Sequence, residues 1–207
     1  MPATVERRRS RRSDSGFTLI EVLVVVALIG IVAAMVVPQT NSMMSGYKLK
    51  GNAEALNNMI ALAKMRAAAQ FSRARVRADL GARTFQLQTW NKTDETWVTE
   101  GGVMTLADGV TFGFAAIGAP PPDTQDAIGQ SPPCTDDGGG AIADTACITF
   151  NSRGMPVTNA QPPVGVLTGN SALYITDGTA VYGSTVTTTP FIKSWWSANA
   201  NNQWVRQ

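Results

Sequence analysis

The chain has 207 residues, of which 17 are Lys or Arg, 15 are Asp or Glu and none is His. The absence of histidine excludes a Ser-His or Cys-His nucleophile system and an imidazole metal site. The sequence also lacks the glycine-rich loops that bind phosphate or dinucleotides. We therefore expect no enzymatic activity, no cofactor and no metal site. The length suits a stalk helix with one globular domain.

The N-terminus joins a basic segment to a long apolar one. Five arginines lie within the first twelve residues, and residues 17–37 then contain a single charged residue, Glu21. At a rise of about 1.5 Å per residue, this stretch covers roughly one bilayer thickness. A carboxylate at that depth costs about 2.5–3.5 kcal/mol on insertion scales, so Glu21 is expected to have a function. The arginines favour a cytoplasmic N-terminus with the rest of the chain across the membrane.

The order of these segments differs from that of an ordinary secretory signal, which is cut after its apolar stretch. A cut between Gly16 and Phe17 would come before that stretch and leave it on the mature protein. This arrangement resembles the class III signal of type IV prepilins and type II secretion pseudopilins, with Glu21 fifth after the cut. The resemblance implies a leader peptide at residues 1–16, cleaved by a prepilin peptidase that also N-methylates Phe17. An uncleaved signal anchor is the alternative.

The same resemblance assigns two further roles in this segment. Glu21 is expected to act in assembly, by pairing with the Phe17 amine of a neighbouring subunit in a low-dielectric environment. Pro38 stands where such anchors commonly carry a proline that kinks the helix. We therefore predict a transmembrane anchor helix at residues 17–38.

A second helical pattern follows the anchor. Apolar residues recur at a spacing that places them on one face of an amphipathic helix: Leu49, Ala53, Leu56, Ile60, Ala63, Ala67, Phe71 and Ala74. We predict a stalk helix at residues 39–75 that continues the anchor and lies on a sheet.

From Val76 the apolar period becomes two, which is typical of strands. Residues 91–95 separate two such stretches as a hairpin connection would. Short strand candidates lie at residues 76–80, 85–88, 110–114, 148–150, 173–176, 180–182, 192–196 and 203–205. The predicted fold class is α+β: a long N-terminal helix packed on an antiparallel β-sheet head domain at residues 76–207.

One segment of the head lacks this alternating strand pattern. Residues 115–147 are rich in Gly, Pro and Asp and contain the only cysteines, Cys134 and Cys147. In an exported chain this pattern predicts a disulfide, which stabilises a loop of this size by about 3 kcal/mol. A free or metal-binding pair is the alternative. Five acidic residues of the loop could offer oxygens to Ca²⁺, but a solvated acidic loop explains their spacing better: Asp123, Asp126, Asp136, Asp137 and Asp144.

Charge is distributed unevenly after the anchor. Residues 48–83 hold eight basic and two acidic side chains, whereas residues 84–207 hold four basic and ten acidic ones. We interpret these segments as a basic stalk and an acidic head. Solvated surfaces explain the pattern, and electrostatic complementarity between neighbouring subunits is the alternative.

The C-terminus gathers aromatic and basic residues that could stack on single-stranded nucleic acid: Lys193, Trp195, Trp196, Trp204 and Arg206. The simpler interpretation is that the indoles cover an open edge of the head. The acidic balance of the head also disfavours contact with phosphates, so we do not expect nucleic acid as a partner.

The head adds to the resemblance. The segment at residues 62–71, followed by 76–80, is similar to the helix end and first strand of the GspH/FimT group of minor pilins and pseudopilins. Residues 148–157 are similar to a strand and turn of that group. The resemblance implies a minor subunit of a type II secretion pseudopilus or type IV pilus, at or near the tip. A DNA-binding minor pilin for natural transformation and a major shaft pilin are the alternatives.

This resemblance also implies the location and the partners. The chain would be a single-pass protein of the bacterial inner membrane, with a periplasmic head, before it enters a filament. Its partners would be the prepilin peptidase, the inner membrane, and other pilins or pseudopilins bound through the N-terminal helix.

Overall fold

A computed structural model describes residues 16–160, 165–198 and 203–207, and within helix α1 it leaves the side chains of residues 35–42 undescribed. The chain divides into two compact units, Met1–Ser42 and Met43–Gln207. The predicted leader, apart from Gly16, therefore lies outside the described residues.

Helix α1 comprises Leu19–Ala69. Thr18, the residue before it, is the N-cap: its side-chain oxygen accepts a hydrogen bond from the backbone N–H of Glu21 at 3.3 Å. At the other end, the N–H of Ser72 donates to the carbonyl of Ala67 at 3.1 Å, and Phe71 has a positive φ of 49°. This is the Schellman arrangement that ends many helices.

The predicted stalk helix was therefore several residues too long. Ala74 is buried as expected but belongs to the first strand, and Phe71 lies in the helix-ending turn with 74% of its surface exposed. The six earlier members of the predicted apolar face are at most 3% exposed, which confirms the face itself. A left-handed residue ended the helix where the apolar period alone would have continued it.

The N-terminal unit contains the first part of α1. Its apolar side chains between residues 19 and 32 are exposed. Among the described residues, no helix has the length and apolarity needed to cross a membrane. The side chain of Pro38 and the end of the predicted anchor belong to the undescribed range, so the predicted kink falls outside the described residues.

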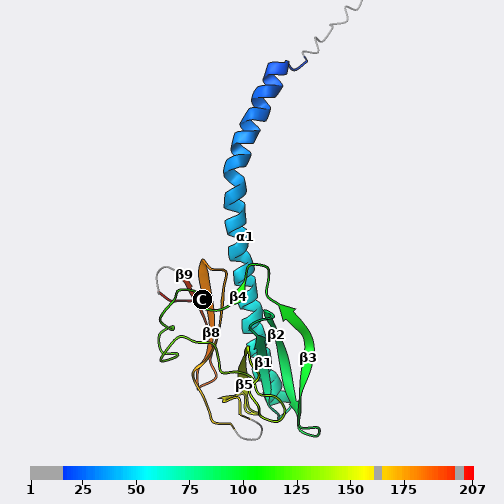
Figure 1. The fold of residues 1–207 in the computed structure, drawn as a ribbon, viewed down its shortest axis with the longest axis vertical. Coiled ribbons are helices and arrows are strands. Elements are labelled where there is room, and N and C mark those ends of the chain that lie inside the picture. The colour runs from blue at the N-terminus through cyan, green and yellow to red at the C-terminus, as the bar shows by residue number, and fades with distance from the viewer. Residues whose placement is uncertain (1–15, 161–164, 199–202) are drawn as a thin grey trace, which may run out of the picture. The chain divides into compact units, whose positions relative to one another are not determined.

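The second unit packs the rest of α1 against two antiparallel sheets (Figure 1). The first sheet, in the order β3-β2-β1-β5-β6, consists of β1 (Ala74–Asp79), β2 (Thr84–Asn91), β3 (Thr96–Thr105), β5 (Thr145–Phe150) and β6 (Pro156–Val157). The second sheet, in the order β10-β9-β8-β7-β4, consists of β4 (Thr111–Phe112), β7 (Ser171–Thr176), β8 (Ala180–Val186), β9 (Ile192–Ala198) and β10 (Val205–Arg206). The predicted fold class is confirmed.

Most predicted strands are present, with bounds that differ by a few residues. The predicted hairpin joins β2 to β3, where Trp90 lies opposite Trp97. Strand β6 was not predicted; it contains two residues and begins with a proline. A strand this short has no alternation to detect.

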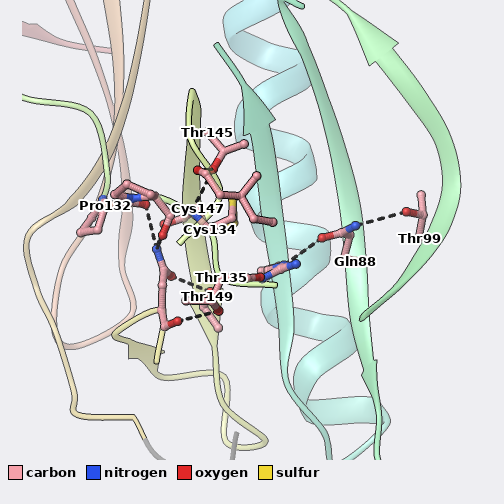
Figure 2. The surroundings of a disulfide bond; sticks show 12 residues. Gln88, Thr99, Pro132, Cys134, Thr135, Thr145, Cys147 and Thr149 are labelled. Atoms are coloured by element: carbon pink, nitrogen blue, oxygen red, sulfur yellow. Dashed lines mark hydrogen bonds between the residues drawn. A yellow bond between two sulfur atoms is a disulfide. The ribbon is translucent and has the colours of Figure 1, made fainter. Parts of the chain in front are cut away.

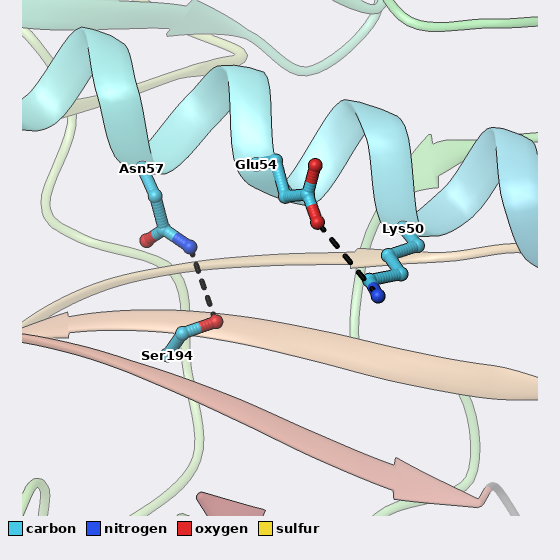
Figure 3. A network of polar contacts seen from close by, with 4 residues as sticks. All are labelled: Lys50, Glu54, Asn57 and Ser194. Carbon is cyan, nitrogen blue, oxygen red and sulfur yellow. Dashed lines mark hydrogen bonds and ion pairs between the residues drawn. The ribbon is translucent and has the colours of Figure 1, made fainter. Parts of the chain in front are cut away.

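One apolar core joins the helix to both sheets. Its members come from α1, from β1, β2 and β5 of the first sheet, and from β7 and β8 of the second. The helix also makes a polar contact with the second sheet, because the side-chain amide of Asn57 donates to the hydroxyl of Ser194 at 3.1 Å (Figure 3). In the two helical turns before Asn57, Lys50 and Glu54 form an exposed ion pair at 3.9 Å.

The predicted insertion runs between β4 and β5, and its end was misplaced. Thr145 to Cys147 belong to β5 rather than to the loop. The predicted disulfide between Cys134 and Cys147 is confirmed, with the two Cα atoms 4.9 Å apart and both residues at most 1% exposed (Figure 2). The bond therefore ties the insertion to a central strand.

Backbone hydrogen bonds also attach the insertion to both sheets. The N–H of Ser131 donates to the carbonyl of Ala172 in β7 at 2.7 Å. One residue later, the carbonyl of Pro132 accepts a bond from the N–H of Cys147 in β5 at 3.0 Å. All residues of β5 and β7 are buried as a result, because α1 covers one face of these strands and the insertion covers the other.

Candidate functional site

The N-terminal segment holds the residues predicted to be processed. Gly16, Phe17 and Thr18 precede the helix and have no regular secondary structure, and Phe17 is 83% exposed. Glu21 lies in the first turn of α1 and is exposed as well. The predicted cut between Gly16 and Phe17 therefore falls in accessible, non-helical backbone just before the N-cap.

The apolar part of α1 that follows has side chains available for contact along its length. A shallow hollow of about 410 Å³ lies on this part of the helix, and its lining is formed by four aliphatic residues, Leu28, Ile29, Val32 and Ala33. Such a surface suits close packing against another apolar helix.

The outer face of the first sheet carries a buried cation, Arg75. Its Nε donates to the amide oxygen of Gln88 at 2.8 Å, one terminal nitrogen donates to the carbonyl of Thr135 at 2.7 Å, and its guanidinium lies 3.8 Å from the centre of the Trp97 ring. Burial and, to a smaller extent, the charge of Arg77 lower the pKa of Arg75 to about 9, although Asp137 acts in the opposite direction. The group remains charged at neutral pH.

The basic side chains of residues 48–83 are divided between α1 and the first sheet. Arg75 belongs to β1 and Arg73 directly precedes that strand, so the prediction that both lie on the stalk helix was wrong. Arg77 lies in β1, within the strand predicted at residues 76–80. Arg66 does lie on α1, and it forms an ion pair with Glu100 of β3 at 2.6 Å. Several cations of the stretch are thus used within the subunit.

Two acidic side chains of the insertion act as hydrogen-bond acceptors. Asp136 accepts a bond from the N–H of Gly140 at 2.7 Å, and Asp137 accepts one from the N–H of Trp97 at 2.8 Å. Among the described residues, no group of three or more His, Cys, Asp or Glu side chains is arranged to hold a metal.

The C-terminal aromatics do not form one platform. Trp195 and Trp196 are consecutive in β9 and therefore face opposite sides of the sheet. Trp195 is buried and donates its indole N–H to Thr185 at 2.9 Å. Trp204 donates to the carbonyl of Ala119 at 2.9 Å and packs on Tyr174. Both indoles are thus engaged in covering the second sheet and the insertion.

The two basic residues predicted with them lie beside Trp195. The ammonium of Lys193 is 6.0 Å from the centre of the Trp195 ring, and Arg206 is the cross-strand neighbour of Trp195 in β10. The structure therefore brings Lys193, Trp195 and Arg206 together and separates them from Trp196.

The C-terminal end of α1 forms a surface that the sequence did not single out. Phe71 lines a hollow of about 410 Å³ together with Ser72, Arg73, Trp90 and Lys92 among others. Lys92 donates to the backbone carbonyl of Phe71. The only sequence signal available was an aromatic at the end of an apolar period, which we had assigned to the core.

Comparison with known proteins bears on the N-terminal segment. Residues 11–37 match the family model of the prokaryotic N-terminal methylation motif. The chain has a prepilin-like N-terminus. The resemblance predicted from Gly16, Phe17 and Glu21 is thereby confirmed.

One curated relative of this prepilin-like chain matches over a short stretch alone. A stretch of 32 residues is 66% identical to type II secretion system core protein G of Pseudomonas aeruginosa, and it makes up 16% of this chain and 22% of that protein. The chain thus spans about a fifth of the length of the curated relative that it matches.

Two similar solved structures are of the minor pseudopilin EpsH from the type 2 secretion system of Vibrio cholerae. The first is 13% identical, with a TM-score of 0.44, and covers 74% of this chain and 99% of that one. The second is 12% identical, with a TM-score of 0.39, and covers 77% of this chain and 92% of that one.

Proposed function

We propose that this chain is a minor pilin or pseudopilin, a structural subunit of a type II secretion pseudopilus or type IV pilus. The observation that carries the proposal is the match of residues 11–37 to the N-terminal methylation motif. The accessible, non-helical backbone around Gly16 and Phe17 suits cleavage, and the exposed apolar side chains that follow suit a membrane and a helix bundle.

The proposal includes a sequence of events for the N-terminus. A prepilin peptidase removes residues 1–16 and methylates the amine of Phe17, and α1 holds the chain in the bacterial inner membrane with a cytoplasmic N-terminus and a periplasmic head. Glu21 then pairs with the Phe17 amine of a neighbouring subunit, since two unpaired charges in an apolar environment are costly. Pro38 kinks the helix.

A type II secretion pseudopilus is the first choice among the filaments. The 32-residue match to core protein G of such a system supports it. We place this subunit at or near the tip because its head carries a long insertion built into both sheets, which a repeating shaft subunit does not need. The positions of Trp195, Trp196 and Trp204 support a covering role over DNA binding.

Intact mass measurement on protein extracted from native membranes tests the processing. The expected mature chain begins at Phe17 and carries one added methyl group. A chain that still begins at Met1, or one cut after Ala34 at the end of an ordinary signal, would contradict the proposal.

Replacement of Glu21 by Val tests the assembly role. The change removes a charge that the bilayer disfavours, so membrane insertion should be unchanged or improved. Incorporation into sheared filaments should fall strongly. Normal incorporation of Glu21→Val would show that the pairing with the Phe17 amine is not needed.

A further inference from the structure

The hollow beside the C-terminal end of α1 combines positive charge with apolar surface. Its volume is about 410 Å³, which lies within the range of ligand-binding pockets. Its lining includes two basic residues, Arg73 and Lys92, two aromatic residues, Phe71 and Trp90, and one acidic residue, Glu95. We call it the first hollow.

Arg73 is the more deeply buried of the two basic residues. It is 8% exposed, and one terminal nitrogen donates to the carbonyl of Ala160 at 2.7 Å. Burial lowers the pKa of Arg73 below its usual value, because the charged guanidinium is removed from water. A bound anion would offset this cost, and a guanidinium can donate two parallel hydrogen bonds to a carboxylate.

Lys92 brings a second positive charge from the hairpin that joins β2 to β3. Its ammonium donates to the backbone carbonyl of Phe71, which holds it beside the end of α1. A carbonyl fixes an ammonium in place without neutralising it. Among the described residues Phe71 is the one hydrogen-bond acceptor of Lys92, so two of its three N–H donors remain for a ligand.

The charge of the first hollow selects the kind of anion. Two basic residues against Glu95 leave one net positive charge in the described lining. A carboxylate would neutralise that charge, whereas a phosphate dianion would leave an excess negative charge in a partly buried site. Phe71 and Trp90 offer apolar surface to the group that bears the carboxylate.

A second hollow adjoins the first and makes the site longer. Its volume is about 370 Å³, and the two hollows share Ser72, Trp90 and Lys92 in their linings. The second hollow is also lined by the polar side chains of Gln70 and Asn91. Side chains of this kind can form hydrogen bonds with peptide groups. The two hollows together therefore suit a peptide better than a small acid.

We propose that the two hollows bind the C-terminal end of a peptide, with its carboxylate between Arg73 and Lys92. The last side chain of the peptide is apolar and packs against Phe71 and Trp90. Capture of a terminal carboxylate is a recurring mode of peptide recognition. The partner is thus a protein with an accessible C-terminus that ends in an apolar residue. This inference goes beyond the structural role proposed above and does not depend on it.

Calorimetric titration of the full chain in detergent tests the ligand, with the peptide acetyl-Ala-Ala-Phe as the probe. The dissociation constant should be about 10–100 µM. The same peptide with a C-terminal amide should bind at least about tenfold more weakly, because it lacks the negative charge. Equal binding of the two peptides, or no binding of either at about 1 mM, would overturn the proposal.

Two small anions distinguish a peptide site from a simpler anion site. Phenylpropionate has a ring and a carboxylate but lacks the preceding peptide groups, and inorganic phosphate has only the charge. Both should bind at least about tenfold more weakly than the peptide, because they make no hydrogen bonds in the second hollow. If either anion binds as tightly as the peptide, the peptide is not the occupant.

Replacement of Lys92 tests the role of its charge. Lys92→Gln should weaken binding of the carboxylate peptide at least about fivefold and leave binding of the amide peptide unchanged. Lys92→Arg, which keeps the charge, should retain at least half of the affinity. Lys48→Gln, at an exposed position of α1 outside both hollows, is the matched control and should bind normally. Unchanged affinity in Lys92→Gln would contradict the proposal.

Replacement of Phe71 tests the apolar wall without removing a charge. Phe71→Ala should weaken binding of the carboxylate peptide at least about threefold, because part of the apolar contact is lost. Phe191→Ala is the control, since Phe191 is exposed and lines neither hollow. An equal effect of the two substitutions would argue against the site. If a variant unfolds, as its melting temperature would show, the comparison of the two peptides on the unaltered chain still decides.

Discussion

The two faces of the head sheets are buried by different kinds of interaction. On the inner face, Ala74, Val76 and Ala78 of β1 are fully buried against the apolar side of α1. On the outer face of the same strand, Arg75 is 2% exposed and is held by hydrogen bonds and by the Trp97 ring. The two faces of β1 are therefore equally buried, one by apolar packing and the other by polar contacts.

The second sheet repeats the contrast. Leu173 and Ile175 of β7 belong to the core shared with α1. Ala172 and Tyr174 of the same strand belong instead to a second cluster, which includes Ile117 of the insertion. The Tyr174 hydroxyl donates to Gln125 at 2.8 Å, and burial raises the pKa of Tyr174. The inner faces depend on transfer of apolar surface from water, and the outer faces depend on satisfying polar groups that the insertion buries.

The largest expected effect tests the inner face. Ile60 is fully buried on α1, so Ile60→Ala should destabilise the isolated unit of residues 43–207 by about 2–5 kcal/mol. Chemical denaturation with a fluorescence readout measures it. Leu62→Ala, two residues away on the exposed side, should cost no more than about 0.5 kcal/mol, and similar losses for both would refute the predicted helix orientation.

The disulfide tests how firmly the insertion holds the outer faces. Replacement of Cys134 and Cys147 by Ala should cost about 2–4 kcal/mol, because the free loop gains entropy in the unfolded state. Hydrogen exchange should then increase at Ser131 more than at Val76, since the insertion loosens before the inner core. Alkylation of the unaltered, denatured protein should label no cysteine before reduction and two afterwards, and labelling before reduction would argue against the bond.

Arg75 tests whether the polar outer face contributes to stability. Arg75→Ala leaves the Thr135 carbonyl and the Gln88 side chain without their donor, and should cost about 2–3 kcal/mol. Arg75→Lys keeps the charge but not the planar guanidinium, so it should recover only part of the loss. A neutral effect of Arg75→Ala would mean that the insertion is held by its backbone bonds and the disulfide alone.

The smallest expected effect concerns one glycine of the second sheet. A Cβ atom on Gly183 would lie 2.6 Å from a ring carbon of Tyr174, so Gly183→Ala should destabilise the unit by about 1–3 kcal/mol. Gly102→Ala is a suitable control, because its Cβ would have no neighbour within 4 Å. If the two variants are equally stable, Tyr174 has room to move and the outer face is less tightly packed than the inner one.

The sequence predictions were more accurate for the inner faces, which pack on α1, than for the outer faces, which the insertion covers. The apolar face of α1 and the alternation in β1 and β2 were predicted, because a surface that packs on one core shows its period in the sequence. The insertion was recognised by its composition and was predicted to be a long loop with a disulfide. Its role could not be predicted, because the bonds of Gln130, Ser131 and Pro132 to β7 and β5 join residues far apart in the chain.

The end of α1 shows most clearly what the apolar period of the sequence cannot predict. Phe71 continues the apolar period, yet it lies in a left-handed turn with its ring exposed. Periodicity records which residues are apolar and does not record where the helix stops. That position depends on where β1 must begin in order to pair with β2 and β5.

The sequence by itself determined the prepilin-like N-terminus, the fold class and the disulfide, because each depends on composition or on short-range spacing. The tertiary structure alone decided which side chains the insertion covers, how Arg75 is satisfied, which face each tryptophan occupies and which apolar residues remain exposed on α1. These features arise when distant segments compete for the same surface, and the free energy of that competition depends on the whole arrangement rather than on any local pattern.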